Sequence, residues 1–291
     1  MARILVTGAG GMLGSAVAAT AMAAGHDVSA RERSRLDITD AAAVAEAVGA
    51  EPWDAVINCA AWTDVDGAEE HEEQATLVNG DGAGNLARAC AASGVRLVHV
   101  STDYVFDGAK GSPYLESDPT GPRSAYGRGK LAGEEAVTAS GADHAIVRTG
   151  WLYGAGGGNF VDTILRLAGE RDSISVVDDQ TGRPTWTGDL APALVACATA
   201  PATGIFHAAG EGSCTWFGLA RAALELAGSP CVVEPTTTGS FPRPAPRPAF
   251  SVLDSERGDE AVRLGAWQDG LVAYLTETGV AQPAAAGGGA K

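Results

Sequence analysis

Short apolar runs alternate along the first half of the chain with longer, Ala-rich segments that carry regularly spaced polar residues. The apolar runs are rich in Val and Ile and are bounded by turn residues, which predicts β-strands. These runs cover residues 3–7, 27–30, 55–58, 97–101 and 144–148. The segments between them have a helix-forming composition. The predicted helices cover residues 15–24, 41–48, 72–92 and 125–138.

Strands joined by helices of this length indicate βαβ units with right-handed crossovers. Such units build a parallel sheet that is covered by helices on both faces, so the sequence predicts the α/β class with a doubly wound sheet. The regular alternation ends near residue 150, at a Gly-rich run and before a Pro/Arg segment. We expect a nucleotide-binding domain over 1–150, which 188–208 rejoin as a helix and a strand. We expect a smaller, irregular α/β substrate region over 151–187 and 209–281, and a flexible tail over 282–291.

Charge and composition restrict the partners of this chain. Its 291 residues are 45% hydrophobic, which is enough to bury a sizeable core, but the formal net charge is −16. Such a charge repels polyanions, so nucleic acid and anionic membranes are excluded as partners. Five scattered cysteines are typical of small buried side chains, and no apolar stretch is long enough to span a membrane. We expect a soluble, cytoplasmic monomer or homodimer.

A glycine-rich turn follows the first predicted strand and opens a helix, which is the context that a dinucleotide-binding fingerprint requires. Gly8 allows the sharp turn, Gly11 lets the backbone approach a pyrophosphate, and Gly14 lets the helix pack against the strand. The positive end of the helix would then face the phosphates, and Met12 and Leu13 are expected to contact the cofactor. The sequence therefore predicts a dinucleotide site within an acidic chain.

The residues after the second strand indicate which dinucleotide binds. Arg31, followed by Arg33 and Arg35, stands where an NAD-specific site would place an acid. A guanidinium group can bind the 2′-phosphate of NADP, so NADPH is preferred and NADH is the alternative. Asp37 and Ile38 could hold the amino group and the ring of the adenine. Asp37 could equally cap the next helix.

A second set of residues points to carbonyl chemistry. Tyr126 and Lys130 are four residues apart and share one face of a predicted helix. Thr102 lies at the end of the fourth strand, where open α/β sheets bind their ligands. Thr102 would orient a carbonyl group and Tyr126 would donate a proton to it. Lys130 would lower the pKa of the phenol from about 10 and hold the nicotinamide ribose.

The motifs of the chain together resemble one family. They are Thr-Gly-x-x-Gly-x-x-Gly at 7–14, Asn-Cys-Ala-Ala-Trp-Thr-Asp-Val-Asp at 58–66, Ser-Thr-Asp-Tyr-Val-Phe-Asp-Gly at 101–108, Tyr-Gly-Arg-Gly-Lys at 126–130, Arg-Thr-Gly-Trp-Leu-Tyr-Gly at 148–154, Asp-Asp-Gln-Thr-Gly-Arg-Pro-Thr at 178–185 and Arg-Pro at 247–248. The chain is similar to the extended short-chain dehydrogenases/reductases. Within that group it resembles the dTDP-4-dehydrorhamnose reductase family, which implies a Rossmann-type doubly wound parallel sheet.

The resemblance also implies an activity and a set of site residues. The activity is the NADPH-dependent reduction of a dTDP-4-keto-6-deoxyhexose, with Thr102, Tyr126 and Lys130 as the catalytic trio. The cofactor channel would be lined by Ala60, Ala61, Trp62 and Val100. The residues expected to contact the sugar nucleotide are Thr102, Asp103, Trp151, Asn159, Arg183 and Arg247. Arg243 is either a further diphosphate contact or a loop charge.

Two alternatives stay open beside this interpretation. Trp62 stands where the rhamnose enzymes commonly have His, so the substrate could be a related dTDP-sugar of specialised metabolism, such as a precursor of a dihydrostreptose-type product. A regulatory subunit of methionine adenosyltransferase resembles the same family, so the chain could be a non-catalytic NADP-binding subunit. Elimination chemistry is disfavoured, because Tyr104 stands where sugar dehydratases of this fold have Glu.

Overall fold

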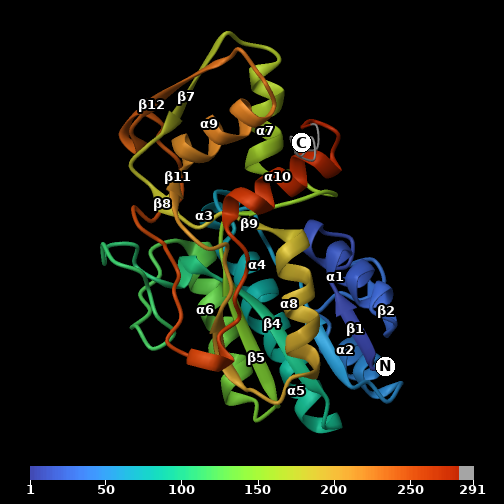
Figure 1. The fold of residues 1–291 in the computed structure, drawn as a ribbon. Coiled ribbons are helices and arrows are strands. Elements are labelled where there is room, and N and C mark those ends of the chain that lie inside the picture. The colour runs from blue at the N-terminus through green and yellow to red at the C-terminus, as the bar shows by residue number, and fades with distance from the viewer. Residues whose placement is uncertain (282–291) are drawn as a thin grey trace, which may run out of the picture.

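A central sheet of six parallel strands organises the computed structural model, which describes residues 1–281 (Figure 1). The predicted tail, 282–291, lies outside the described residues. The strand order is β10-β5-β4-β3-β1-β2. The strands are β1 (Arg3–Thr7), β2 (Asp27–Arg31), β3 (Ala55–Asn58), β4 (Arg96–Thr102), β5 (His144–Thr149) and β10 (Gly204–His207). This arrangement confirms the predicted doubly wound α/β class.

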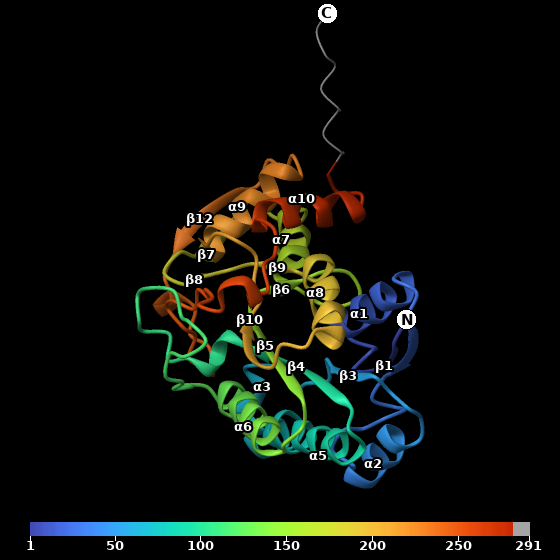
Figure 2. The same ribbon diagram turned by 60° about the horizontal axis from the view of Figure 1, so that its bottom comes forward.

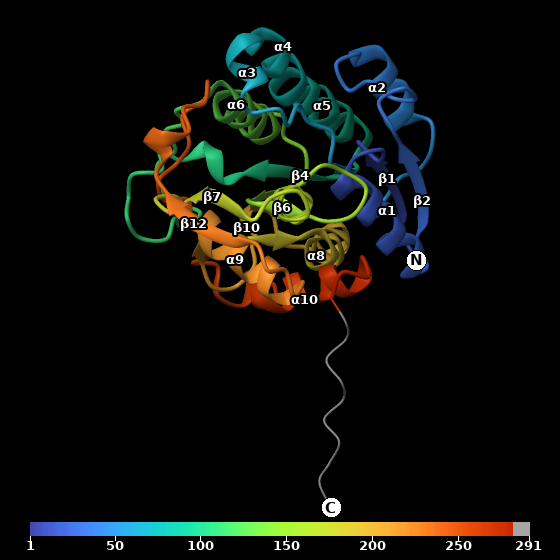
Figure 3. The ribbon, with the colours of Figure 1, turned by 90° about the horizontal axis from the view of Figure 1, so that it is seen from above.

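Helices cover both faces of the sheet (Figure 3). One layer holds α1 (Met12–Ala23) and α8 (Thr187–Thr199), and the other holds α2 (Ala41–Gly49), α5 (Ala83–Ser93) and α6 (Ala125–Ala139). The alternation of side chains along β1 shows why both layers form. Ile4 and Val6 are buried in the core beside α1 and α8, whereas Leu5 is buried in the core beside α2 and α5. The four inner strands, β1, β3, β4 and β5, therefore each contribute apolar side chains to two cores.

The predicted helix over 72–92 is present, but its middle is widened into a π-helix. It consists of α4 (Glu72–Thr76), a π-helical segment (Leu77–Gly82) and α5. The widened segment places the Asn79 amide against the backbone of Trp62, with hydrogen bonds of 2.8 and 3.0 Å. It also brings Gly82 so close to Ile38 that an added Cβ would lie 2.7 Å from the Ile38 side chain. The predicted helix is therefore confirmed over its length, and the widened turn within it, which supports the loop after β3, was not predicted.

The residues beyond β5 build a smaller region at one end of the sheet (Figures 1 and 2). Three two-stranded ladders and three helices form it. The pairs are β6 (Leu152–Tyr153) with β9 (Thr185–Trp186), β7 (Ser173–Val177) with β12 (Val232–Thr236), and β8 (Thr181–Gly182) with β11 (Cys214–Thr215). The helices are α7 (Phe160–Ala168), α9 (Trp216–Leu226) and α10 (Trp267–Glu277). Between these elements the chain returns to the sheet, because α8 packs on α1 and β10 pairs with β5.

Shorter elements complete the fold. They are the helix α3 (Gly67–Glu70) and the 3₁₀ turns Asp103–Val105, Thr238–Ser240 and Gly258–Glu260. Across residues 1–281, no helix is both long enough and apolar enough to cross a membrane. The order of the sheet reverses at β1, which pairs with β2 on one side and with β3 on the other. In doubly wound folds such a switch point leaves a crevice for ligands at the carboxyl ends of the strands.

Candidate active site

A cavity of about 900 Å³ lies at this switch point. The carboxyl ends of β1, β3, β4 and β5 contribute to its wall, together with the start of α6 and the residues that lead into β6. Most of the predicted site residues line it. They are Gly8, Gly11, Met12, Leu13, Gly14, Asp37, Ile38, Ala60, Ala61, Trp62, Val100, Thr102, Asp103, Tyr126, Lys130 and Trp151.

The glycine turn after β1 has the close approaches that the fingerprint requires. Gly8 has a φ of +68°, and a Cβ there would lie 2.5 Å from the backbone N of Ala60. A Cβ on Gly14 would lie 2.2 Å from the Gly8 carbonyl oxygen. The helix α1 begins at Met12, three residues earlier than predicted, and no side chain caps it. Its first backbone N–H groups therefore face the cavity, as a pyrophosphate site requires.

The adenosine end of the cavity differs from the prediction at Arg31. This residue is the last of β2, and its Nε donates to the Ser29 hydroxyl at 3.0 Å rather than lining the cavity. Glu32 and Arg33 line the cavity instead. The strand continues one residue further than predicted, and the side chains beyond it turn into the crevice. Arg33 is therefore the cation that can bind a 2′-phosphate. The Glu32 carboxylate beside it can accept hydrogen bonds from ribose hydroxyls.

Asp37 does not cap the next helix, because Asp40 does so by accepting hydrogen bonds from the backbone of Ala42 and Ala43. The Asp37 carboxylate accepts hydrogen bonds from the backbone N–H and the hydroxyl of Thr39, at 3.0 and 2.8 Å. These bonds hold its pKa below the ordinary range. Asp37 is thus an ionised acceptor at the cavity wall, and the capping interpretation of this residue is wrong.

The start of α6 presents the predicted proton donor. The Ser124 hydroxyl caps the helix by accepting from the backbone N–H of Gly127 at 3.1 Å. A Cβ on Gly127 would lie 2.3 Å from the Tyr104 carbonyl oxygen, so this glycine lets α6 approach the end of β4. The rings of Tyr104 and Tyr126 meet edge to face at 5.6 Å. Tyr126 is thereby placed at the cavity wall beside Thr102.

Lys130 lies one turn further along α6 and is 2% exposed. Its ammonium group donates a hydrogen bond to the Val100 carbonyl oxygen at 2.6 Å. Burial lowers its pKa to about 8, although the negative charge of Glu134 acts in the opposite direction. The structure thus holds a lysine with a reduced pKa at the floor of the cavity.

The expectation that Lys130 lowers the pKa of the Tyr126 phenol is wrong in this structure. Burial raises the pKa of Tyr126 to about 12, with Thr102 acting in the opposite direction and Asp103 in the same direction. The desolvation of the phenolate outweighs the nearby charges. The phenol is therefore protonated at neutral pH, which is the state that a proton donor needs.

Asp103 follows Thr102 and is 2% exposed. The Thr102 hydroxyl donates to one oxygen of its carboxylate at 3.1 Å, whereas the other oxygen is buried with no hydrogen-bond partner among the described residues. Burial nevertheless raises the pKa of Asp103 to about 6. Gly150 makes room for the carboxylate, because a Cβ there would lie 2.7 Å from the Asp103 Cγ. The site therefore holds an acid that titrates near neutral pH.

A buried ion pair supports this site, and our sequence analysis missed it. Glu134 and Arg148 are each 3% exposed at the side chain and approach to 2.6 Å. The Ser101 hydroxyl donates to the same carboxylate at 2.5 Å. Glu134 follows Lys130 by four residues and therefore lies on the same face of α6. This spacing could have predicted a buried carboxylate behind the site.

Two predicted substrate residues do not line the cavity because they have structural partners. The Asn159 amide donates to the Gly154 carbonyl oxygen at 3.0 Å, and its side-chain oxygen caps α7. Arg247 donates to Asp66 at 3.0 Å, and Arg243 lies 3.3 Å from the same carboxylate. The Pro/Arg segment is therefore attached to the loop after β3 through one aspartate.

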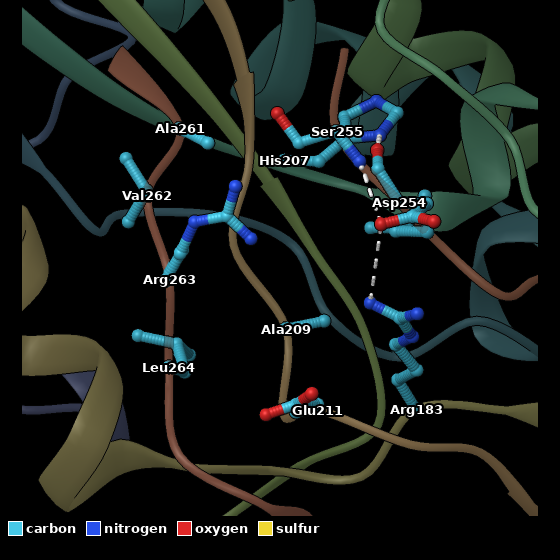
Figure 4. A pocket seen from close by; sticks show the side chains of 11 residues that line it. Arg183, His207, Ala209, Glu211, Asp254, Ser255, Ala261, Val262, Arg263 and Leu264 are labelled. Atoms are coloured by element: carbon cyan, nitrogen blue, oxygen red, sulfur yellow. Dashed lines mark hydrogen bonds and ion pairs between the residues drawn. The ribbon is translucent and has the colours of Figure 1, made fainter. Parts of the chain in front are cut away.

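Arg183 is placed in a second, smaller cavity of about 260 Å³ (Figure 4). Glu211, Asp254 and Arg263 share that cavity with it. One guanidinium nitrogen of Arg183 is 3.9 Å from the Asp254 carboxylate. Figure 4 shows the side chains of Arg183 and Arg263 on opposite sides of this space. The structure therefore does not bring Arg183 together with the predicted catalytic residues.

Comparison with known proteins identifies the family. The family model described as the RmlD substrate binding domain matches residues 2–280. The chain is 51% identical to a dTDP-4-dehydrorhamnose reductase of Streptomyces griseus over 263 residues, which cover 88% of this chain and 86% of that protein. It is 48% identical to a dTDP-4-dehydrorhamnose reductase of Mycobacterium tuberculosis over 282 residues, which cover 94% and 92%.

A solved structure agrees with the sequence relatives. The crystal structure of dTDP-4-dehydrorhamnose reductase from Bacillus anthracis in complex with NADP superimposes with a TM-score of 0.91. The two chains are 36% identical, and the match covers 96% of this chain and 100% of the other. The fold, the cavity at the switch point and the sequence relatives all agree. The chain therefore belongs to the dTDP-4-dehydrorhamnose reductase family.

Proposed function

We propose that this protein reduces the 4-keto group of a dTDP-4-keto-6-deoxyhexose with NADPH, converting dTDP-4-dehydrorhamnose to dTDP-L-rhamnose. One observation carries the proposal. Thr102, Tyr126 and Lys130 line a single cavity whose other end is the glycine turn at Gly8 and Gly14. A candidate proton donor and a turn of the kind that binds phosphates thus share one cavity, which supports carbonyl reduction by a nicotinamide.

The residues of the site account for the proton. NADPH supplies a hydride to the carbonyl carbon, and the carbonyl oxygen then needs one proton to become an alcohol. Tyr126 holds that proton at neutral pH, because burial raises the pKa of its phenol to about 12. Thr102 offers a hydroxyl to the same oxygen, which orients the carbonyl toward the phenol. The buried ammonium group of Lys130 lines the same cavity and would hold the nicotinamide ribose.

The walls of the cavity account for the two ligands. Arg33 would bind the 2′-phosphate of NADPH, and Ala60, Ala61 and Trp62 would line the channel that leads to the nicotinamide. Trp151 would pack against the apolar face of the hexose. Arg247 does not line the cavity, but it donates to Asp66 at 3.0 Å on the loop after β3, and other residues of that loop line the cavity. It would contact the sugar diphosphate, which would compete with Asp66 for the guanidinium group.

The test is the loss of NADPH absorbance on adding enzymatically prepared dTDP-4-keto-L-rhamnose. The wild-type protein should turn over, and Tyr126→Phe should bind NADPH with the same affinity but lose turnover, because it lacks the proton. Analysis of the product by NMR separates dTDP-L-rhamnose from a related sugar. Binding of NADPH without turnover on any dTDP-4-keto sugar would refute the proposal and favour a regulatory subunit.

A further inference from the structure

The backbone of Trp151 has an uncommon conformation. Its φ is +51°, and among residues 1–281 no other residue except glycine has a positive φ. A bulky side chain in this left-handed region is strained, and such strain persists only where surrounding contacts impose it. Trp151 lies between β5 and β6 and lines the cavity. The chain therefore maintains a strained conformation at the wall of its site.

The contacts that impose this conformation surround the indole. The ring of Trp216 stacks on it, with centroids 3.5 Å apart and planes inclined by 3°. Gly182 borders the ring so closely that a Cβ there would lie 2.3 Å from its Cε2 atom. The Trp151 carbonyl oxygen accepts a hydrogen bond of 3.1 Å from the backbone N–H of Thr185. One face of the indole is thus covered by a second indole, while Trp151 still borders the cavity.

Trp216 is itself held in place by contacts within the second region. It is the first residue of α9, and its indole N–H donates to the Gln180 side-chain oxygen at 3.1 Å. The Gln180 amide nitrogen donates in turn to the Thr238 hydroxyl at 2.9 Å. Phe160 packs against the Trp216 ring with centroids 4.5 Å apart. These contacts come from three separate segments, so the orientation of Trp216 is determined by the fold of the second region.

We propose that Trp216 is a positioning residue that fixes Trp151 as a flat apolar wall for the hexose ring of the substrate. Trp216 does not line the cavity, so it acts through Trp151. A 6-deoxyhexose presents C–H groups and a methyl group on its apolar side, and a preoriented indole binds such a surface without losing rotamer freedom. This inference rests on the proposed function.

A spectroscopic experiment tests the stacking of Trp216 on Trp151 and does not depend on enzyme activity. The six tryptophans can be labelled with 5-fluorotryptophan, and the ¹⁹F resonance of Trp151 is assigned by its loss in Trp151→Phe. Removal of the stacked ring in Trp216→Leu should shift the Trp151 resonance, and Trp216→Phe should shift it less. Trp53→Phe is the matched control, because Trp53 donates to Ala47 and packs in the core beside α2. It should leave the Trp151 resonance in place.

A kinetic experiment tests the role in substrate binding. Trp216→Leu should raise KM for the sugar nucleotide by about 2- to 10-fold, the range expected for one aromatic pair. The affinity for NADPH should not change, and Trp216→Phe should restore most of the loss. If Trp216→Leu does not fold, Trp216→Phe carries both measurements with a smaller effect in each.

Two results would overturn the proposal. One is a Trp151 resonance that does not move when Trp216 is replaced. The other is a moved resonance with the KM of the wild type. A wild-type protein that turns over no dTDP-4-keto sugar would instead refute the proposed function. The shift of the Trp151 resonance alone would then decide whether Trp216 holds Trp151.

Discussion

Replacing Lys130 by Met should make the protein more stable at neutral pH while it removes reductase activity. Lys130 is 2% exposed, and burial lowers its pKa from the ordinary 10.5 to about 8. The folded state therefore disfavours the ammonium group relative to the unfolded chain. Methionine has a similar length and no charge, so it fills the same space without this cost. Under the proposed function, a lysine in the site that lowers stability is an expected compromise between stability and activity.

The size of the effect follows from the pKa of Lys130. A fall from 10.5 to about 8 corresponds to about 3 kcal/mol of destabilisation when the lysine is charged. The variant loses the hydrogen bond from Lys130 to the Val100 carbonyl oxygen, which offsets about 1–2 kcal/mol. We therefore expect the free energy of unfolding of Lys130→Met to exceed that of the wild type by about 1–2 kcal/mol below pH 8.

The difference in unfolding free energy between the two proteins should vary with pH. Between about pH 8 and 10.5 the unfolded chain still binds the lysine proton, whereas the folded protein has released it. The free energy of unfolding rises with pH wherever the unfolded state binds more protons than the folded state. In this pH range the wild type therefore becomes more stable relative to Lys130→Met. Urea unfolding of both proteins, at about pH 7 and about pH 9.5, measures the difference.

A suitable control is Lys110→Met, because Lys110 lies at the surface and pairs with Asp118. Its replacement should change the free energy of unfolding by less than about 1 kcal/mol at either pH. A Lys130→Met variant that is less stable than the wild type at neutral pH would refute the reasoning. So would a difference that is the same at both pH values, because the buried charge would then not be its cause.

Three further predictions follow from the site. Glu134→Gln should lower the free energy of unfolding by about 3–5 kcal/mol, because it leaves the buried Arg148 guanidinium group without its counter-charge. In the control, Glu170→Gln at an exposed ion pair should lower it by less than about 1 kcal/mol. The alkaline limb of kcat/KM should have an apparent pKa of about 8 and move to higher pH in Lys130→Arg; an unmoved limb would assign it to another group. Arg33→Ala should raise the Kd of NADPH by about 10- to 100-fold in fluorescence titrations and leave the Kd of NADH unchanged. An equal rise of the NADPH Kd in Arg31→Ala would contradict the assignment of the 2′-phosphate to Arg33.

Each site residue that was predicted correctly from the sequence has a position that is fixed locally, by a single strand end, turn or helix. Gly8 and Gly14 belong to a single turn after β1, and Thr102 is the last residue of β4. Tyr126 and Lys130 are held together by one helical turn. In each case the local geometry fixes the placement, and the parallel sheet brings the strand ends to one edge. Local patterns within residues 1–150 are therefore sufficient to predict that these groups share one site.

A shift of one residue was enough to change the prediction for the 2′-phosphate. The predicted second strand stops at residue 30, but β2 continues through Arg31, which pairs in register with Thr7. Successive side chains of a strand point to opposite faces, so one added residue changes which side chains leave the sheet toward the ligand. Arg33 is a close neighbour of Arg31 in the sequence, yet only the register of β2 shows that it lines the cavity.

The residues that sequence analysis misplaced depend on how the second region folds. Arg183 follows β8, and its position is set by loops near Glu211 and Asp254 rather than by the central sheet. Asn159 was expected to contact the sugar nucleotide, but its amide nitrogen donates to the backbone and its side-chain oxygen caps a helix. Such placements arise from pairings between segments far apart in sequence, which local patterns do not specify.

The distribution of charge in the cavity explains how an acidic chain can bind phosphorylated ligands. Among the described residues that line it, the cations are Arg33 and Lys130, and the acids are Glu32, Asp37 and Asp103. The Arg33 side chain is 80% exposed, so salt screens its charge. The lining carries no excess of positive charge, and the pyrophosphate must therefore be held by the backbone N–H groups at the start of α1. The conformation of the glycine turn, rather than the net charge, then determines whether a dinucleotide binds.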